Sequence, residues 1–189
     1  ETDAAFLVAE TVYNSELMAP YDILQHSIFR DSTNYIECFI VSEDGGKFTT
    51  FEGITVESHY SFENAPNVDI LIIPSTGNSM SKDLENEKYI AWLKKAAEQA
   101  QYVISVCDGA FPLAATGLLD DRDATTFPAD RARLKEMFPK IRVHDDVNLV
   151  VDGKFVTSAG GALSYEPALY VVEKIYSKAH AQRTAQGLV

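Results

Sequence analysis

The chain has 189 residues, 46% hydrophobic and 23% charged, a composition typical of a globular protein with a sizeable core. Its net charge of −12 argues against a nucleic-acid partner, because phosphate binding needs a basic surface. No apolar stretch approaches the roughly 20 residues that span a bilayer, so we expect no membrane partner.

The first half of the chain alternates the patterns of β-strands and α-helices. We expect strands at Ala4–Val8 and Tyr35–Val41, a helix at Leu17–Phe29 between them, and short strands at Lys47–Thr50 and Thr55–Glu57 after a turn at Asp44–Gly46. Val68–Ile73 is a nearly continuous apolar run that ends at Pro74. Such a run is typical of a buried parallel strand.

The second half continues the alternation. Asp83 is expected to cap a helix that reaches about Ala100, and a strand then ends at Cys107. The elements expected after it are a helix ended by Gly117, a helix at Asp130–Met137, a hairpin of Leu149–Val151 and Lys154–Thr157 around Asp152–Gly153, a helix at Leu163–Ser177 and a short terminal helix.

This alternation, without repeats or a long linker, predicts one α/β domain over residues 1–189 with a doubly wound, mostly parallel sheet. In such sheets ligands bind beyond the carboxyl ends of the strands. Three loops are expected at that edge: Glu10–Leu17, Pro74–Met80 and Cys107–Gly109.

Cys107 is the foremost candidate for chemistry. It ends the apolar run Tyr102–Val106, and Gly109 allows a sharp turn into a helix. We expect the thiol to be exposed beside the helix N-terminus, where the thiolate is favoured. The alternative is a buried strand-end cysteine without a role. Cys38 is the second cysteine, so one disulfide but no disulfide-built scaffold could form.

Two further features are expected at the same edge. Glu16 lies at the start of the first helix. There its negative charge either interacts favourably with the helix dipole or serves as a general acid and base beside Cys107. The loop containing Thr76, Gly77 and Asn78 either aims N–H groups at an oxyanion and substrate or is an ordinary connection. The four histidines show no metal-site spacing, and no phosphate-loop or dinucleotide motif occurs, so neither metal nor cofactor is expected.

Several segments together resemble the ThiJ/PfpI superfamily, of the class I glutamine amidotransferase-like group. They are Glu16–Asp22, Ile72–Pro74, Val106–Gly109, Leu118–Asp120 with Ala124–Thr126, and Asp152–Ser158 with Gly160–Gly161. The resemblance covers essentially the whole chain. It implies a flavodoxin-like three-layer sandwich with a nucleophile elbow, and a homodimer. Members include stress proteins, peptidase-like proteins, glyoxalases and isocyanide hydratase.

The resemblance also implies roles for individual residues. Cys107 would be the nucleophile or a redox-sensitive thiolate, and Glu16 its carboxyl partner. The N–H of Asp108, with that of Thr76 or Gly77, would form the oxyanion site.

The chain departs from the family pattern at two positions of consequence. Phe127 follows Ala124–Thr126 where many members have a histidine, so the Cys–His pair is absent there and peptidase activity is not expected. Asp108 follows the cysteine where Ala, Thr or Gly is commoner, and its charge should raise the pKa of the thiol. Its side chain either enters the pocket as an acid or base, or caps the elbow helix.

Two functions from different classes remain open on the sequence. The first is a hydratase, lyase or hydrolase that attacks a small electrophilic molecule through Cys107 with Glu16. The second is a non-catalytic protein that senses oxidants through Cys107 or binds a ligand. The chain begins Glu1–Thr2–Asp3, which fits either a sequence boundary or a removed signal peptide, so cytoplasmic and periplasmic locations both remain open.

Overall fold

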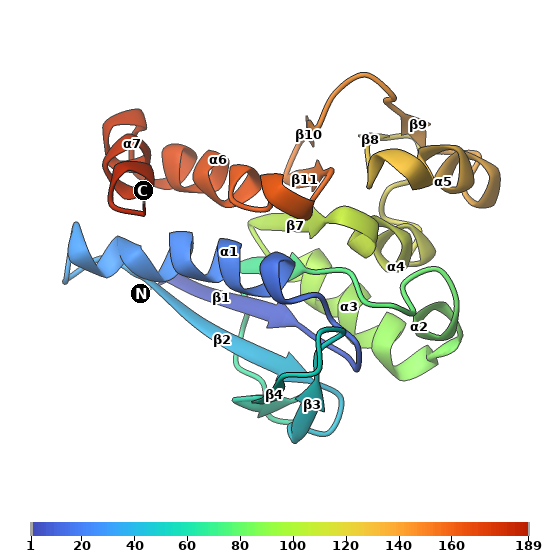
Figure 1. Ribbon diagram of the computed structural model, residues 1–189, viewed down its shortest axis with the longest axis horizontal. Helices are drawn as coiled ribbons and strands as arrows, with labels where there is room; N and C mark the ends of the chain where they lie inside the picture. The colour runs from blue at the N-terminus through green and yellow to red at the C-terminus, as the bar shows by residue number, and fades with distance from the viewer. Residues whose placement is uncertain (1, 189) are drawn as a thin grey trace.

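The computed structural model describes residues 2–188, which form a seven-stranded sheet in the order β10-β11-β7-β6-β1-β2-β5 (Figure 1). The strands are β1 (Thr2–Leu7), β2 (Ile36–Ser42), β5 (Tyr60–Ser61), β6 (Ile70–Ile73), β7 (Tyr102–Val106), β10 (Leu149–Asp152) and β11 (Phe155–Ser158). Neighbouring strands are parallel except β10 and β11, which form an antiparallel hairpin. The expected mostly parallel sheet is confirmed.

Helices cover both faces of this sheet. The helices are α1 (Asn14–Gln25), α2 (Lys82–Glu85), α3 (Glu87–Gln99), α4 (Ala110–Ala115), α5 (Arg131–Met137), α6 (Glu166–Ile175) and α7 (Lys178–Gln186). Because side chains alternate along a strand, Phe6 of β1 faces the core shared with α1 and α6, whereas Leu7 faces the core shared with α3 and α4. This is the predicted three-layer sandwich.

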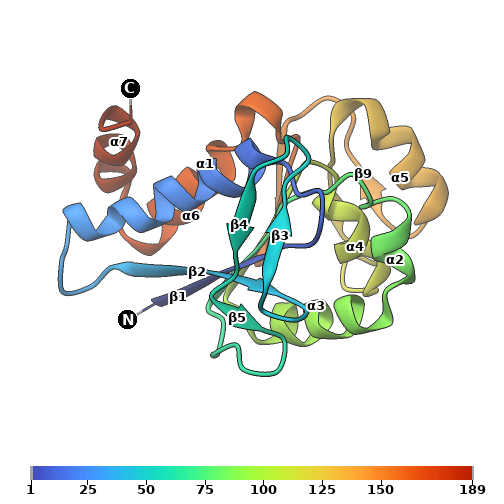
Figure 2. The ribbon, with the colours of Figure 1, turned by 60° about the horizontal axis from the view of Figure 1, so that its bottom comes forward.

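Smaller elements flank the sheet. They are the antiparallel pair β3 (Lys47–Thr49) and β4 (Thr55–Glu57), the parallel pair β8 (Asp123–Ala124) and β9 (Arg142–Val143), and the 3₁₀ helices η1 (His26–Phe29), η2 (Cys107–Gly109), η3 (Pro128–Asp130) and η4 (Gly161–Leu163). Figure 2 shows the β3–β4 hairpin. The Thr11 N–H donates to the Thr49 carbonyl oxygen at 2.8 Å, which ties the hairpin to the loop after β1.

Several element boundaries differ from the expectations; the last long helix, for example, is Glu166–Ile175 rather than Leu163–Ser177. The first helix begins at Asn14 rather than Leu17, and its last turn is the 3₁₀ helix η1. The prediction that Asp83 caps the helix reaching about Ala100 is wrong, because that helix, α3, begins after Asn86, whose side chain accepts a hydrogen bond from the Tyr89 N–H at 3.2 Å. Asp83 instead accepts from the Thr76 hydroxyl at 2.6 Å.

The described residues were also searched for membrane-crossing helices. Within 2–188, no helix combines the length and the apolar character that crossing a bilayer requires.

Candidate active site

Cys107 lies at the turn where β7 passes into the 3₁₀ helix η2 and then into α4. Its backbone is in the left-handed region, with φ of 54°, as is typical of a nucleophile elbow. Gly109 and Gly160 make the turn fit: a Cβ on Gly109 would overlap the Ile73 carbonyl oxygen, and one on Gly160 would overlap the Cβ of Cys107. Three strand ends therefore meet tightly around the cysteine.

The thiol of Cys107 is less accessible than the sequence suggested. The residue is only 8% exposed, so the expectation of an exposed thiol is wrong. Burial raises the pKa of the Cys107 thiol well above its usual value, and the nearby carboxyls of Glu16 and Asp108 raise it further. Cys38 is also a buried free thiol, on β2, so the two cysteines do not form a disulfide.

Glu16 lies in the first turn of α1 and is 4% exposed. Its Oε2 accepts hydrogen bonds from the Ser75 N–H at 2.9 Å and from the Ser75 hydroxyl. Its carboxyl also lies close enough to Cys107 for each group to alter the pKa of the other. Burial raises the pKa of Glu16, while these hydrogen bonds oppose the rise. The carboxyl is thus held against the thiol in a position suited to exchanging one proton with it.

Asp108 follows the cysteine and is 9% exposed. The Thr126 hydroxyl lies 2.9 Å from both Asp108 Oδ1 and the Cys107 carbonyl oxygen. Burial and a hydrogen bond to the Asp130 carboxyl raise the pKa of Asp108 to about 7. Its side chain does not cap the elbow helix. It forms a second carboxyl pair beside the site.

The N–H groups of the loop after β6 donate hydrogen bonds to other residues of the protein. The Thr76 N–H donates to the Ser79 hydroxyl at 2.8 Å, and the Gly77 N–H donates to the hydroxyl and carbonyl oxygens of Thr11. The two N–H groups that the resemblance offers to an oxyanion are therefore engaged within the protein. The Asp108 N–H remains as the candidate donor, because it lies in the first turn of η2, where N–H groups lack helical acceptors. Asn78, one residue farther along the same loop, lines a separate cavity.

The four histidines all have other partners. His144 Nε2 lies 2.7 Å from Asp123 Oδ1, and His59 Nδ1 accepts from the Ile40 N–H at 3.0 Å. His26 contacts the Asp22 carbonyl oxygen, and His180 stacks on Tyr176. Phe127 is 38% exposed at the position where relatives carry a histidine. His144, which contacts Asp123, does not take the place of that histidine.

Sequence reasoning missed two groups beside Cys107. Ser75 fixes Glu16, and Tyr13 lies close enough to Glu16, Cys107 and Asp108 for their charges to raise its pKa, after the larger effect of burial. The Tyr13 ring packs on Phe51, with the ring centroids 4.7 Å apart. Tyr13 lies in the same loop as Glu16, which was the one signal available in the sequence.

No group of three or more His, Cys, Asp or Glu residues that could hold a metal ion occurs among residues 2–188. The groups present at this edge are a buried thiol, a carboxyl that can exchange its proton, and a helix-start N–H group.

Comparisons with known proteins agree with this architecture. The isonitrile hydratase of Pseudomonas putida is 30% identical over 177 residues, which are 94% of this chain and 73% of the hydratase. An HTH-type transcriptional regulator of Pseudomonas aeruginosa is 25% identical over 138 residues, 73% of this chain but 37% of the regulator. The chain thus spans well under half of that regulator.

The solved structure of a ThiJ/PfpI family protein from Pseudomonas syringae superposes with a TM-score of 0.84 at 22% identity, covering 97% of this chain and 73% of the other. That likeness shows the fold. The model of the DJ-1/PfpI family matches residues 2–174, so the chain belongs to the DJ-1/PfpI family.

Proposed function

We propose that the chain is a cysteine-dependent enzyme that adds water to a small electrophilic molecule, with an isonitrile as the first candidate substrate. One observation carries the proposal: Cys107 sits at a strained elbow beside the carboxyl of Glu16, and Ser75 fixes that carboxyl with two donors. The similarity to an isonitrile hydratase over 94% of this chain supports the choice of substrate.

The chemistry follows from these positions. Glu16 accepts the thiol proton as the Cys107 sulfur attacks the terminal isonitrile carbon, forming a C–S bond, and the proton passes to that carbon. The product of this step is a thioimidate on Cys107. Water then adds to the thioimidate carbon, the C–S bond breaks, and the sulfur regains a proton. The product leaves as an N-substituted formamide, and one water molecule has been consumed.

The high pKa of the resting thiol suits this pairing. A buried site disfavours a free anion, so the proton leaves Cys107 only when an electrophile accepts the electron pair of the sulfur. The Asp108 N–H lies where it can stabilise charge that develops on the bound substrate. Because all four histidines have partners elsewhere, Glu16 carries the proton transfer alone.

The redox-sensing alternative has less support from the geometry. Peroxide reacts with the thiolate, and both burial and the neighbouring carboxyls keep Cys107 protonated. A homodimer and the absence of nucleic-acid binding remain proposals, the second resting on the net charge of −12.

The decisive variants are Cys107→Ala and Glu16→Gln, assayed with a small isonitrile, methylglyoxal and an activated ester. We expect hydration of the isonitrile to disappear in Cys107→Ala. In Glu16→Gln we expect kcat to fall roughly 100-fold or more, because the amide still accepts from Ser75 but cannot take up a proton. Cys38→Ala is the matched control, since it removes the other buried thiol, and should keep activity per folded molecule.

Turnover that survives Cys107→Ala would refute the proposal. Selective oxygen addition at Cys107 under graded peroxide, seen by intact mass in a protein without turnover, would favour the sensor instead.

A further inference from the structure

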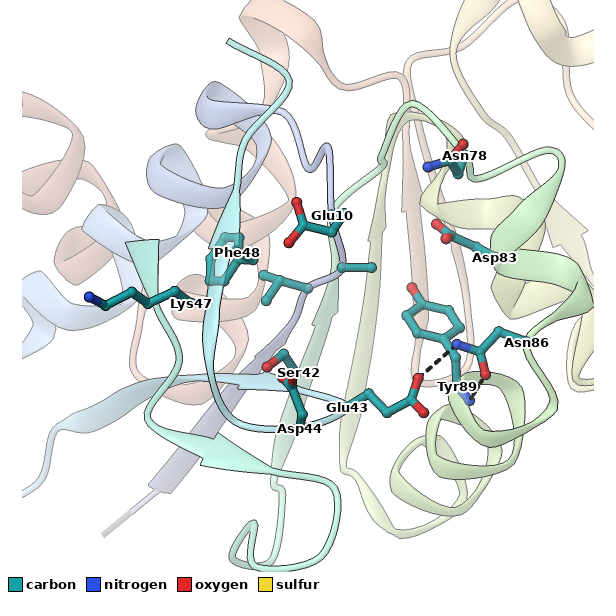
Figure 3. A pocket seen from close by; sticks show the side chains of 12 residues that line it. Glu10, Ser42, Glu43, Asp44, Lys47, Phe48, Asn78, Asp83, Asn86 and Tyr89 are labelled. Atoms are coloured by element: carbon teal, nitrogen blue, oxygen red, sulfur yellow. Dashed lines mark hydrogen bonds between the residues drawn. The ribbon is translucent and has the colours of Figure 1, made fainter. Parts of the chain in front are cut away.

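A second pocket, separate from Cys107, opens at the same edge of the sheet. It is a cavity of about 370 Å³ lined by the loops after β1 and β2, by β3 and by the α2–α3 region (Figure 3). This volume falls within the ordinary range of small-molecule sites. Neither Cys107 nor Glu16 lines the cavity.

The cavity lies where the sheet changes its winding direction. From β1 the chain runs outward to β2 on one side, and it later returns to β6 on the other side of β1. The crevice beyond such a switch point is the usual ligand position in open α/β sheets. Val8 and Glu10 after β1 and Asn78 after β6 line the cavity, so it occupies this crevice.

The lining is acidic. Glu10, Glu43, Asp44 and Asp83 contribute carboxylates, and Lys47 is the cation among the lining residues. Figure 3 shows the Lys47 ammonium group directed away from Asp83. The cavity therefore carries uncompensated negative charge, which favours a cation over an anion or a neutral molecule.

Tyr89 places a polar group in the cavity, independently of the carboxylates. The residue is 2% exposed and lines the cavity, yet among residues 2–188 its hydroxyl has no hydrogen-bond partner. Figure 3 shows this hydroxyl pointing into the space between Glu10 and Asp83. The Tyr89 hydroxyl is therefore available to a bound group in the cavity.

The neighbouring carboxylates differ in how far they are engaged. Glu10 Oε2 accepts from the Thr49 N–H at 3.1 Å, and Glu43 Oε2 accepts from Asn86 Nδ2 at 2.8 Å. Asp83 Oδ2 accepts from the Thr76 hydroxyl, and its Oδ1 has no hydrogen bond to residues 2–188. Asp83 and Tyr89 thus present two unused polar atoms to the same cavity.

We propose that this cavity binds a small organic ammonium ion, with the ammonium group between Asp83 and the Tyr89 hydroxyl and the carbon chain against Val8, Ala9 and Phe48. An ammonium group has several N–H donors and matches both acceptors. A bare metal ion fits less well, because within the described part of the chain no three His, Cys, Asp or Glu side chains converge on a metal position. The apolar lining residues also suit a carbon chain.

The pocket is joined to the cysteine site through the loop after β6. Thr76 donates to Asp83, while the adjacent Ser75 donates to Glu16. The binding proposal itself does not depend on catalysis at Cys107, so it can fail or hold independently of the proposed function.

Isothermal titration calorimetry with butylamine tests the proposal, using 1-butanol as the uncharged comparison and tetramethylammonium as a cation without N–H donors. We expect butylamine to bind at one site per chain, at least about tenfold more tightly than either comparison, since hydrogen bonds to charged groups are the stronger ones. The Cys107→Ala protein should bind butylamine unchanged.

Two variants and one control locate the site. Asp83→Asn should weaken butylamine binding at least about tenfold, and Tyr89→Phe should weaken it severalfold. Glu85→Gln removes the same charge from an exposed position of α2 and should leave binding unchanged. Tyr89→Phe deletes a hydroxyl that holds no hydrogen bond, so it remains a valid test if Asp83→Asn fails to fold.

Three results would overturn the inference. They are an absence of binding up to millimolar butylamine, equal binding of butylamine and 1-butanol, and binding that Tyr89→Phe and a folded Asp83→Asn both leave unchanged.

Discussion

Around Cys107, three acidic groups lie close together, and their burial disfavours the charged form of each. Glu16, Asp108 and the thiol are all more than nine-tenths buried, and the pKa of each is raised by burial. In such surroundings a second anion is costly, because little water screens it. A reaction that passes one proton and one electron pair through the site avoids that cost, as the proposed addition to a neutral electrophile does.

Asp108 should make the stability of the protein fall with rising pH. Its pKa is about 7 in the folded protein, above the 3.8 of an unperturbed aspartate, so between these pH values the folded state binds more protons than the unfolded state. Stability from this group is fully present at the low end of that window and is lost as the pH rises through about 7. We expect Asp108→Asn to gain stability relative to the wild type across the same window.

Urea denaturation at several pH values between 4.5 and 8 measures this difference. The exposed Asp146→Asn is the control, and its difference from the wild type should stay flat. If the Asp108→Asn difference were equally flat, the carboxyl pair with Asp130 would not titrate as the structure indicates.

At the scale of elements, the elbow depends on the loop between β11 and η4. Gly160 has φ of 72° and ψ of −150°, a combination essentially restricted to glycine, and any Cβ there would overlap Cys107. The next residue, Gly161, has φ of 59° but open space around its Cβ position. A substitution at Gly161 would therefore strain the backbone only, whereas one at Gly160 would add a steric overlap.

Gly160→Ala should reduce stability by roughly 2–4 kcal/mol, because strain and overlap add, whereas Gly161→Ala should cost about 1 kcal/mol from its left-handed backbone alone. Chemical denaturation gives both values. If the proposed function holds, turnover per folded molecule should fall in Gly160→Ala and persist in Gly161→Ala. Equal losses of stability would show that the loop can move away from Cys107.

The sequence predicts the elements of this fold well and their contacts poorly. Apolar runs such as Val68–Ile73 and the position of Cys107 after β7 follow from local pattern, so the sheet and its carboxyl edge could be predicted. The burial of Cys107 depends on Gly160, which is distant in sequence. The helix cap falls at Asn86 rather than Asp83 because both are good capping residues and tertiary contacts decide between them.

In the candidate site too, the positions of residues could be predicted from the sequence, but their hydrogen bonds could not. Glu16 and Cys107 could be paired because both follow strands whose carboxyl ends share an edge. The engagement of the Thr76 and Gly77 N–H groups could not be predicted, because it depends on a serine within the loop and on Thr11 in another loop. The free hydroxyl of Tyr89 likewise becomes visible only when α3 is placed against the sheet.

At the scale of the whole molecule, the net charge of −12 has a consequence for stability. Carboxylates gather along the carboxyl edge, at Cys107 and in the second cavity, where Glu10 and Asp83 lie. Like charges repel more strongly in the compact folded state than in the expanded unfolded chain. Mobile ions screen this repulsion over about 30 Å at 0.01 M salt but only about 8 Å at 0.15 M.

Moderate salt should therefore stabilise the protein. We expect the urea midpoint to rise between 10 and 200 mM sodium chloride with an unchanged m-value, since the surface exposed on unfolding stays the same. The double variant Glu63→Lys and Glu85→Lys lowers the net negative charge at two exposed positions and should show a smaller rise. A midpoint that falls with salt would mean that the exposed ion pairs, such as Arg142–Asp123, outweigh the repulsion. An equal rise in the wild type and the double variant would mean that the net charge is not the cause of the salt effect.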